Sequence, residues 1–303
     1  MTESAIRLPG TRDTVLLAVA VVAVSTSAPM IAACAAPALA IAFWRSLLGA
    51  GFTAPLLAIK GLAEFRQLTR RQWVWLVSAG LFLGAHFATW IPSIRFTSVA
   101  SAAALVATQP VWAALIARSM GARVDRGVWV GIAVSLAGVL VLTGIDFSID
   151  PRSLIGDGLA LIGAVLAAAY VTTGERARQS LSTVNYTTVA YLVSALALLP
   201  LCVGFGVQMW GYSARDWLLI LGLTLIAQLL GHTVVSIVLQ STSATVVSLA
   251  ILFELPGAII VAGLFLGQLP SPQVIPALLL LGAGLVVVIR ASRSQEPVET
   301  PPL

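Results

Sequence analysis

"AVAVVAVST", residues 18–26, is a run of small apolar residues that ends in Ser25 and Thr26, and it recurs 146 residues later as "AVLAAAYVT", residues 164–172. Both copies lie inside longer apolar stretches. Of the 303 residues, 59% are hydrophobic and only 10% are charged, with a mean hydropathy of +0.99. Soluble domains are roughly half apolar and a quarter charged. The sequence therefore predicts an integral membrane protein.

The apolar stretches have the length of membrane-spanning helices. A spanning helix needs about 20 mostly apolar residues, and the lipid interior offers no water to pair with free backbone groups. The stretches are too long for barrel strands and do not alternate. We expect an all-α protein with ten transmembrane helices, short connections and no soluble domain. The expected helices cover residues 14–33, 37–59, 73–94, 98–118, 127–144, 155–178, 182–207, 214–239, 242–266 and 271–289.

The basic residues predict the orientation of these helices, because Lys and Arg near span ends are retained in the cytoplasm. If the N-terminus is inside, the outer segments hold only Arg95, Arg152 and Arg215, and Arg45 alone lies within a span. The inner segments hold Arg7, Arg12, Lys60, Arg66, Arg70, Arg71, Arg118, Arg123, Arg126, Arg176, Arg178, Arg290 and Arg293. Both termini are therefore expected in the cytoplasm, in a multi-pass membrane protein.

The net charge of +5 is spread over separate loops. Scattered positive charge of this kind fits contact with anionic lipid headgroups. It does not form the continuous basic surface that nucleic acid needs, so the expected partners are the lipid bilayer and a small-molecule substrate, with no nucleic acid.

The rarest residues of the chain show that it contains a repeat. Its two histidines, His86 and His232, are 146 residues apart, and the same offset pairs Pro110 with Pro256. Matches of rare residues at one constant offset, added to the matched apolar runs, indicate a duplicated unit.

We place the first unit at residues 1–150, with helices one to five, and the second at residues 151–303, with helices six to ten and a short cytoplasmic tail. Because five spans is an odd number, the second unit must cross the membrane in the opposite direction. Inverted repeats of this kind typically enclose a substrate site near the bilayer midplane and work by alternating access.

Polar side chains within the spans predict which faces look inward, since unpaired polar groups are costly in lipid. On the third predicted helix, polar and ring side chains recur every three or four residues around His86. On the eighth, Thr224, Gln228, His232, Ser236 and Gln240 recur every four residues, and on an α-helix only the middle members can share a face.

The expected cavity-lining and substrate-binding residues are His86, Trp90, Thr108, Gln109, Tyr170, His232 and Ser248. For each histidine, a hydrogen-bonded packing role and a substrate contact both stay open. No Cys, Asp or second His stands near enough in sequence to complete a metal-ligand set, so we expect no metal and no cofactor.

Glu254 lies near the midpoint of the ninth predicted helix, where a carboxylate must be neutral, paired or in contact with water. Its counterpart in the first unit is Thr108, and Arg45 is the only basic residue at comparable depth. Two roles stay open: a structural pair with Arg45, or uptake and release of a proton during transport. We favour a structural or gating role, because Glu254 is off the helix face that carries Thr245 and Ser248.

Pro110 and Pro256 stand at equivalent places in the two units. Each removes one helical hydrogen bond and frees a carbonyl, which bends the helix. We expect both bends to act as hinges in the cavity wall.

Three motifs carry a resemblance to a known family: "FWRSLLGA" (43–50), "TQPVWAALIARSMG" (108–121) and "FELPGAIIVAGLFLG" (253–267). Their order and spacing, from about residue 14 to residue 290, resemble the drug/metabolite transporter superfamily in its EamA-type branch. The resemblance implies ten helices in an inverted repeat. The helix 2 arginine and the glutamate–proline step of helix 9 recur in that family and match Arg45, Glu254 and Pro256.

The family is mostly composed of bacterial inner-membrane exporters of amino acids and related metabolites. Within it, the YddG-like exporters of aromatic amino acids look most similar, because Phe87, Trp90 and Tyr170 would give the cavity ring-bearing walls. One departure is that the acidic residue that often follows the glycine at the ends of helices 4 and 9 is replaced here by Ala122 and Gln268.

These observations predict a secondary transporter that exports amino acids, aromatic and other apolar ones, or related small metabolites, with protons as an open coupling partner. No phosphate-binding loop is present, so the chain carries no ATPase of its own. One alternative is an intramembrane enzyme that uses His86, His232 and Glu254, although the H-E-x-x-H and G-x-S-x-G patterns are missing. Another is an importer or nucleotide-sugar carrier of the same fold.

Overall fold

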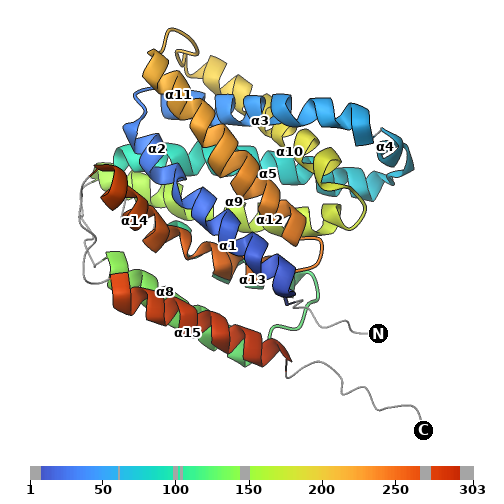
Figure 1. Cartoon of the computed structure of the whole chain (residues 1–303), viewed down its shortest axis with the longest axis vertical. Coiled ribbons are helices and arrows are strands. Elements are labelled where there is room, and N and C mark those ends of the chain that lie inside the picture. The colour runs from blue at the N-terminus through green and yellow to red at the C-terminus, as the bar shows by residue number, and fades with distance from the viewer. Residues whose placement is uncertain are drawn as a thin grey trace.

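The computed structural model describes residues 8–60, 62–97, 102, 105–143, 151–266 and 274–293, and this part of the chain forms helices and turns without a β-strand (Figure 1). The expected start of the fourth helix at residue 98 lies outside the described residues. So do the segment up to the expected boundary at residue 150 and the departure at Gln268.

The helices follow the predicted order, although several predicted spans are divided into shorter elements. The helices are α1 (Thr11–Ser25), α2 (Ser27–Ala33), α3 (Ala38–Lys60), α4 (Ala63–Gln67), α5 (Arg70–Phe96), α7 (Gln109–Ser119), α8 (Arg126–Thr143), α9 (Pro151–Arg178), α10 (Thr183–Gly204), α11 (Ala214–Gly222), the π-helix η1 (Leu223–His232), α12 (Thr233–Val238), α13 (Ala244–Ile251), α14 (Glu254–Leu266) and α15 (Val274–Arg293).

Six helical segments of the described chain are long and apolar enough to cross a membrane. They are Thr11–Ala33, Ala38–Leu57, Arg70–Phe96, Pro151–Arg178, Thr183–Gly204 and Ala214–Val238. Shorter apolar helices cover Arg126–Val141, Ala244–Ala258 and Ile275–Ala291. The protein is therefore a multi-pass, all-helical membrane protein.

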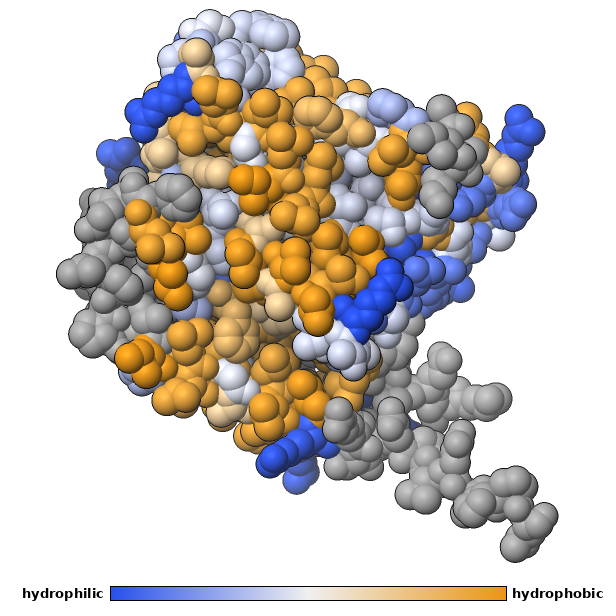
Figure 2. All heavy atoms as spheres, in the orientation of Figure 1, coloured by the Kyte–Doolittle hydropathy of each residue, from blue (hydrophilic) through white to orange (hydrophobic). Residues whose placement is uncertain are grey.

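The outer surface of the bundle suits contact with lipid. Large apolar side chains such as Val203, Leu264 and Leu279 are more than two-thirds exposed. In Figure 2, hydrophobic residues cover most of the visible face, and the most hydrophilic residues gather toward its margins. Extended apolar surface of this kind is unusual on soluble monomers.

The helix pairs follow a pattern that is preserved when the two halves of the chain are exchanged. Helix α3 packs on α10 and α8 packs on α15, so each of these pairs joins one helix of each half. Helix α5 packs on α9, and its counterpart pair is α1 with η1 and α12. The α8–α15 pair runs along one edge of the bundle (Figure 1).

Glycines let the helices of these pairs approach closely. A Cβ atom on Gly80 of α5 would stand 2.6 Å from Val193 Cβ of α10, and one on Gly131 of α8 would stand 2.6 Å from the Gly284 carbonyl oxygen of α15. Neither position has room for a side chain. Small residues at helix contacts are the usual basis of helix association in membranes.

A buried arginine fixes one end of the bundle. Arg178, at the end of α9, donates from Nε to the Ser236 carbonyl oxygen at 2.7 Å and from Nη1 to the Leu181 carbonyl oxygen. Its Nη2 donates to Thr183 Oγ1 at 2.8 Å and to Gln240 Oε1 at 3.2 Å. One guanidinium thereby ties α9 to α12 and to the start of α10.

Figure 1 shows that α1 begins and α15 ends at the same end of the bundle. The connections from α3 to α5 and from α7 to α8 lie at this end as well, and they carry exposed arginines. These are Arg66, Arg70, Arg71, Arg118 and Arg123. Positive charge is thus concentrated at the end that holds both ends of the described chain.

Candidate functional site

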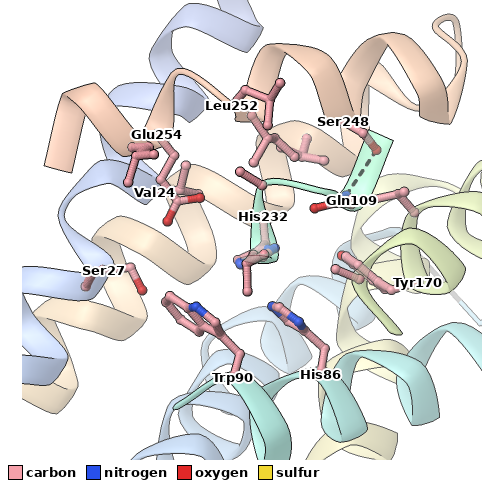
Figure 3. A pocket seen from close by; sticks show the side chains of 18 of the residues that line it. Val24, Ser27, His86, Trp90, Gln109, Tyr170, His232, Ser248, Leu252 and Glu254 are labelled. Atoms are coloured by element: carbon pink, nitrogen blue, oxygen red, sulfur yellow. Dashed lines mark hydrogen bonds between the residues drawn. The ribbon is translucent and has the colours of Figure 1, made fainter. Parts of the chain in front are cut away.

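A cavity lies inside the bundle, and its walls come from both halves of the chain. The cavity has a volume of about 980 Å³, which includes the part that is open to solvent. Residues of α1, α2, α5, α7 and the segment before it, α9, η1, α12, α13 and α14 line it. Six of the seven predicted cavity residues are among them, all labelled in Figure 3: His86, Trp90, Gln109, Tyr170, His232 and Ser248.

The cavity is built on the internal repeat. His86 and His232, which are equivalent under the 146-residue offset, both line it, and so do Val24 and its equivalent Tyr170. Equivalent backbone positions of the two halves therefore surround one space. Their side chains differ, so the chemistry of the two sides is not the same.

His86 is held by a hydrogen bond to the backbone. Its Nδ1 lies 2.9 Å from the Gly163 carbonyl oxygen on α9. Because a carbonyl can only accept, Nδ1 must carry a proton, and in the neutral ring Nε2 keeps a free lone pair. The ring stacks on Trp90 with centroids 5.8 Å apart and planes 9° apart. Together the two rings form a flat wall.

His232 is the last residue of the π-helix η1 and is held by ring contacts. Its ring meets Phe87 edge-on at 5.7 Å and Tyr170 at 6.2 Å between centroids. Neither ring nitrogen has a hydrogen-bond partner among the described residues. The two equivalent histidines thus differ, since one is fixed by a backbone carbonyl and the other keeps its polar atoms available.

The π-helix changes the spacing of the polar side chains along this segment. In a π-helix each hydrogen bond joins residues five apart, instead of four apart as in an α-helix, so one turn contains more residues. Side chains four residues apart lie beyond one full turn of an α-helix, but short of one full turn of a π-helix. Thr224, Gln228 and Ser236 are all fully buried, and only Gln240 is exposed. Of these five polar residues, only His232 lines the cavity. Such π-helical segments frequently occur at functional sites.

Arg45 is fully buried behind one wall of the cavity. Its Nε donates to Gln228 Oε1 at 3.0 Å, and its guanidinium carbon lies 4.1 Å from the centroid of the Phe87 ring. Within the described part of the chain, Nη1 and Nη2 have no hydrogen-bond partner. Phe87 lines the cavity and Arg45 does not. Since Nη1 and Nη2 have no partner among the described residues, Arg45 and Glu254 do not form the direct pair that the sequence left open.

Glu254 lines the cavity, although its sequence position is off the face that carries Ser248. The reason is that the ninth predicted span is interrupted: α13 ends at Ile251, residues 252–253 form a turn, and Glu254 begins α14. The turn rotates Glu254 onto the cavity wall, where Figure 3 shows its side chain among those around the cavity.

Gln109 and Ser248 connect the two halves across the cavity. Gln109 Nε2 donates to Ser248 Oγ at 3.0 Å, so α7 is linked to α13 (Figure 3). Thr108, the seventh predicted residue, is not among the lining residues. Its Oγ1 donates to the Leu105 carbonyl oxygen at 2.6 Å and accepts from Trp112 Nε1 at 3.1 Å.

The two predicted hinge prolines stand in the first turns of helices, directly after a break. Pro110 follows a turn at residues 107–108 and opens α7, and Pro256 follows the turn at residues 252–253 and lies in the first turn of α14. Proline lacks the N–H that would pair with the carbonyl four residues earlier, here that of Val106 and Leu252. Both of these residues line the cavity. At the predicted bends, α-helical hydrogen bonding is thus interrupted locally by a turn.

Comparison with known proteins identifies the family. The EamA-like transporter family matches the chain twice, over residues 14–144 and residues 154–290. The chain belongs to the EamA-like transporter family. The two matches correspond to the two copies of the repeat and together cover most of the 303 residues.

Other comparisons agree with this EamA-like fold. One solved crystal structure has 19% sequence identity to this chain and a TM-score of 0.75. The match covers 95% of this chain and 100% of the solved chain. At that identity the likeness shows the fold alone. Among curated proteins, none matches the chain.

Membership in the EamA-like transporter family implies a protein that moves a small molecule across a membrane. Sequence reasoning missed the hydrogen-bond partner of Arg45. Gln228 holds Arg45, and the signal for it was its position four residues before His232 on the same polar face. In the described residues, no three His, Cys, Asp or Glu side chains gather closely enough to hold a metal ion.

Proposed function

We propose that the protein is a secondary transporter that exports amino acids, aromatic and other apolar ones, or related small metabolites, by alternating access through the central cavity. The supporting observation is the composition of the cavity wall. The rings of His86, Phe87, Trp90, Tyr170 and His232 surround one space between the two halves. Aromatic walls give large apolar contact area with defined geometry, which suits ring-bearing side chains.

The proposed substrate contacts are His86, Trp90, Gln109, Tyr170, His232 and Ser248. The described residues that line the cavity include no Lys or Arg. This favours amino acids over nucleotide sugars and other phosphates with two charges, which need basic partners.

The proposed topology has ten spans in two inverted units, residues 1–150 and residues 151–303. In this topology, both termini lie on the cytoplasmic side of the inner (plasma) membrane. Its support is the accumulation of exposed arginines at the end of the bundle where α1 begins and α15 ends. Positive charge of this kind is retained on the cytoplasmic side.

The proposed movement is a rocking of one half against the other. The breaks before α7 and α14 lie in the cavity wall, where backbone rotation can change the direction of a helix. The Gln109–Ser248 hydrogen bond joins the halves in the present state. We expect it to break when the cavity opens to the other side.

Counterflow in liposomes tests this proposal. Purified protein is reconstituted into liposomes loaded with unlabelled tryptophan, and external labelled tryptophan is added at low concentration. We expect transient accumulation of the label inside, recovered as unaltered tryptophan, and no accumulation in protein-free liposomes. Folded protein that gives no counterflow over a panel of amino acids would contradict the proposal, and chemical conversion of the label would favour the intramembrane enzyme.

A further inference from the structure

We propose that Glu254 binds the ammonium group of the transported molecule, so that the cavity accepts aromatic primary amines that lack a carboxylate as well as aromatic amino acids. This inference rests on the proposed transport function and deepens it. The ammonium group is then the part of the substrate that Glu254 recognises, and aromatic primary amines are an additional substrate class.

The cavity wall is distinguished by the charge of one residue, Glu254. Glu254 is the only Asp, Glu, Lys or Arg side chain among the described residues that line the cavity. The nearest buried cation, Arg45, stands behind Phe87 and uses its Nε on Gln228. A carboxyl group in a largely apolar cavity stays neutral unless water or a cation stabilises its charge. The described lining supplies no cation, so a ligand ammonium group is the partner that would stabilise the charged form of Glu254.

Aromatic side chains share the cavity with this carboxylate. Trp90, Phe87 and Tyr170 line the same cavity, and ring faces attract ammonium groups. The stacked pair of His86 and Trp90 offers a flat surface for an aromatic body. An aromatic amine therefore finds a charge for its ammonium and a wall for its ring.

Among the described residues that line the cavity, a substrate carboxylate finds no equally strong partner. The donors at the cavity wall are neutral: His232 can donate only one N–H as the neutral ring, and Gln109 already uses Nε2 on Ser248. Charge-assisted hydrogen bonds are about twice as strong as neutral ones. The ammonium is thus the anchored group of an amino acid, and the carboxylate is dispensable.

Competition in the tryptophan counterflow assay tests the inference. Tryptamine lacks the carboxylate of tryptophan, and indole-3-propionate lacks its ammonium. We expect tryptamine to inhibit at a concentration similar to that of unlabelled tryptophan. Indole-3-propionate should need at least about tenfold more, because it leaves the buried carboxylate without its cation.

Two variants connect this preference to the residue. Glu254→Gln keeps the shape and removes the charge, and we expect it to lose the preference for tryptamine over indole-3-propionate. Glu64→Gln is the matched control, since Glu64 caps the start of α10 through Ser182 and Asn185 and lies outside the cavity. It should keep the wild-type preference.

The outcomes separate this inference from the proposed function. If the wild type moves tryptophan but indole-3-propionate competes as well as tryptamine, the inference is overturned and transport stands. The same holds if folded Glu254→Gln keeps the preference and loses only its response to a pH gradient, which would assign a proton to Glu254. If Glu254→Gln does not fold, the wild-type ligand comparison still decides.

A binding measurement covers the case in which no tryptophan counterflow is seen. Tryptamine should then raise the melting temperature of the purified wild type more than indole-3-propionate does. Equal or absent shifts from the two ligands would overturn the inference as well.

Discussion

At the scale of single residues, the cavity wall combines ring faces with few hydrogen-bonding groups. Trp90 is 92% buried yet lines the cavity, and its ring stacks on His86. Tyr170 presents its ring on the other side, in contact with His232. Such contacts select a substrate mainly by the shape and area of its side chain.

Truncating either ring should change which amino acids are accepted. For Trp90→Ala and Tyr170→Ala, we expect the half-saturation concentration for tryptophan to rise by about three- to tenfold, in line with about 1 kcal/mol for an aromatic contact. Smaller apolar amino acids should be affected less. Counterflow over a panel of amino acids measures the change, with Trp73→Ala as control because Trp73 stacks on Phe65 outside the cavity. Unchanged selectivity in both variants would remove these rings from the site.

The sequence predicted much of the cavity because polar residues in lipid must face inward. The same reasoning failed where the backbone departs from a regular α-helix. It placed Thr108 in the wall and Glu254 off the helix face that carries Ser248, since a helical projection carries no sign of the breaks at residues 107–108 and 252–253. The partner of Arg45 was missed for a similar reason, because contact with Gln228 depends on how α3 and η1 pack.

At the scale of elements, the irregular segments concentrate on the cavity. The breaks before α7 and α14 and the π-helix η1 all contribute residues to its wall. The helix pairs outside it, α3 with α10 and α8 with α15, form a close-packed frame. Apolar composition predicts that helices exist, whereas the π-helix, with the same composition as its neighbours, could not be predicted.

Restoring the hydrogen bond at the second break should slow the transport cycle. Pro256→Ala gives α14 an N–H that can pair with the Leu252 carbonyl. We expect turnover to fall several-fold while the half-saturation concentration stays within about twofold, because a stiffer hinge slows movement more than binding. Pro200→Ala is the control, since Pro200 lies exposed in α10 and away from the cavity. Equal effects of the two substitutions, or none, would contradict the hinge.

The frame depends on glycines at helix contacts. A methyl group at Gly80 meets Val193 Cβ at 2.6 Å and the Ala190 carbonyl oxygen at 2.8 Å, so Gly80→Ala must push α5 away from α10. We expect a loss of about 1–3 kcal/mol of stability. Gly158→Ala, on α9 with nothing within 4 Å, should instead be neutral or stabilising by up to about 1 kcal/mol. Thermal unfolding in detergent compares the two, and equal stability would contradict the close packing of α5 on α10.

At the scale of the whole molecule, the proposed alternating access requires two similar halves that cross the membrane in opposite directions around one cavity. The two family matches establish the duplication. The helix pairs that are preserved when the halves are exchanged agree with it. An odd number of spans in each half would place equivalent residues on opposite sides of the membrane while keeping both chain ends together.

Cysteine accessibility in intact cells tests this arrangement most directly. The native Cys34 and Cys202 are buried, and burial raises the pKa of the Cys34 thiol, so replacing both by alanine removes only a slow background. Single cysteines are then placed at the exposed positions Gly10, Arg123, Gln208 and Arg215. A membrane-impermeant maleimide should label positions 208 and 215 from outside, and positions 10 and 123 only after the membrane is opened. Labelling of positions 10 and 123 from opposite sides, or of positions 123 and 208 from the same side, would contradict the proposed order of spans. Labelling of position 10 from outside would contradict the cytoplasmic placement of the N-terminus.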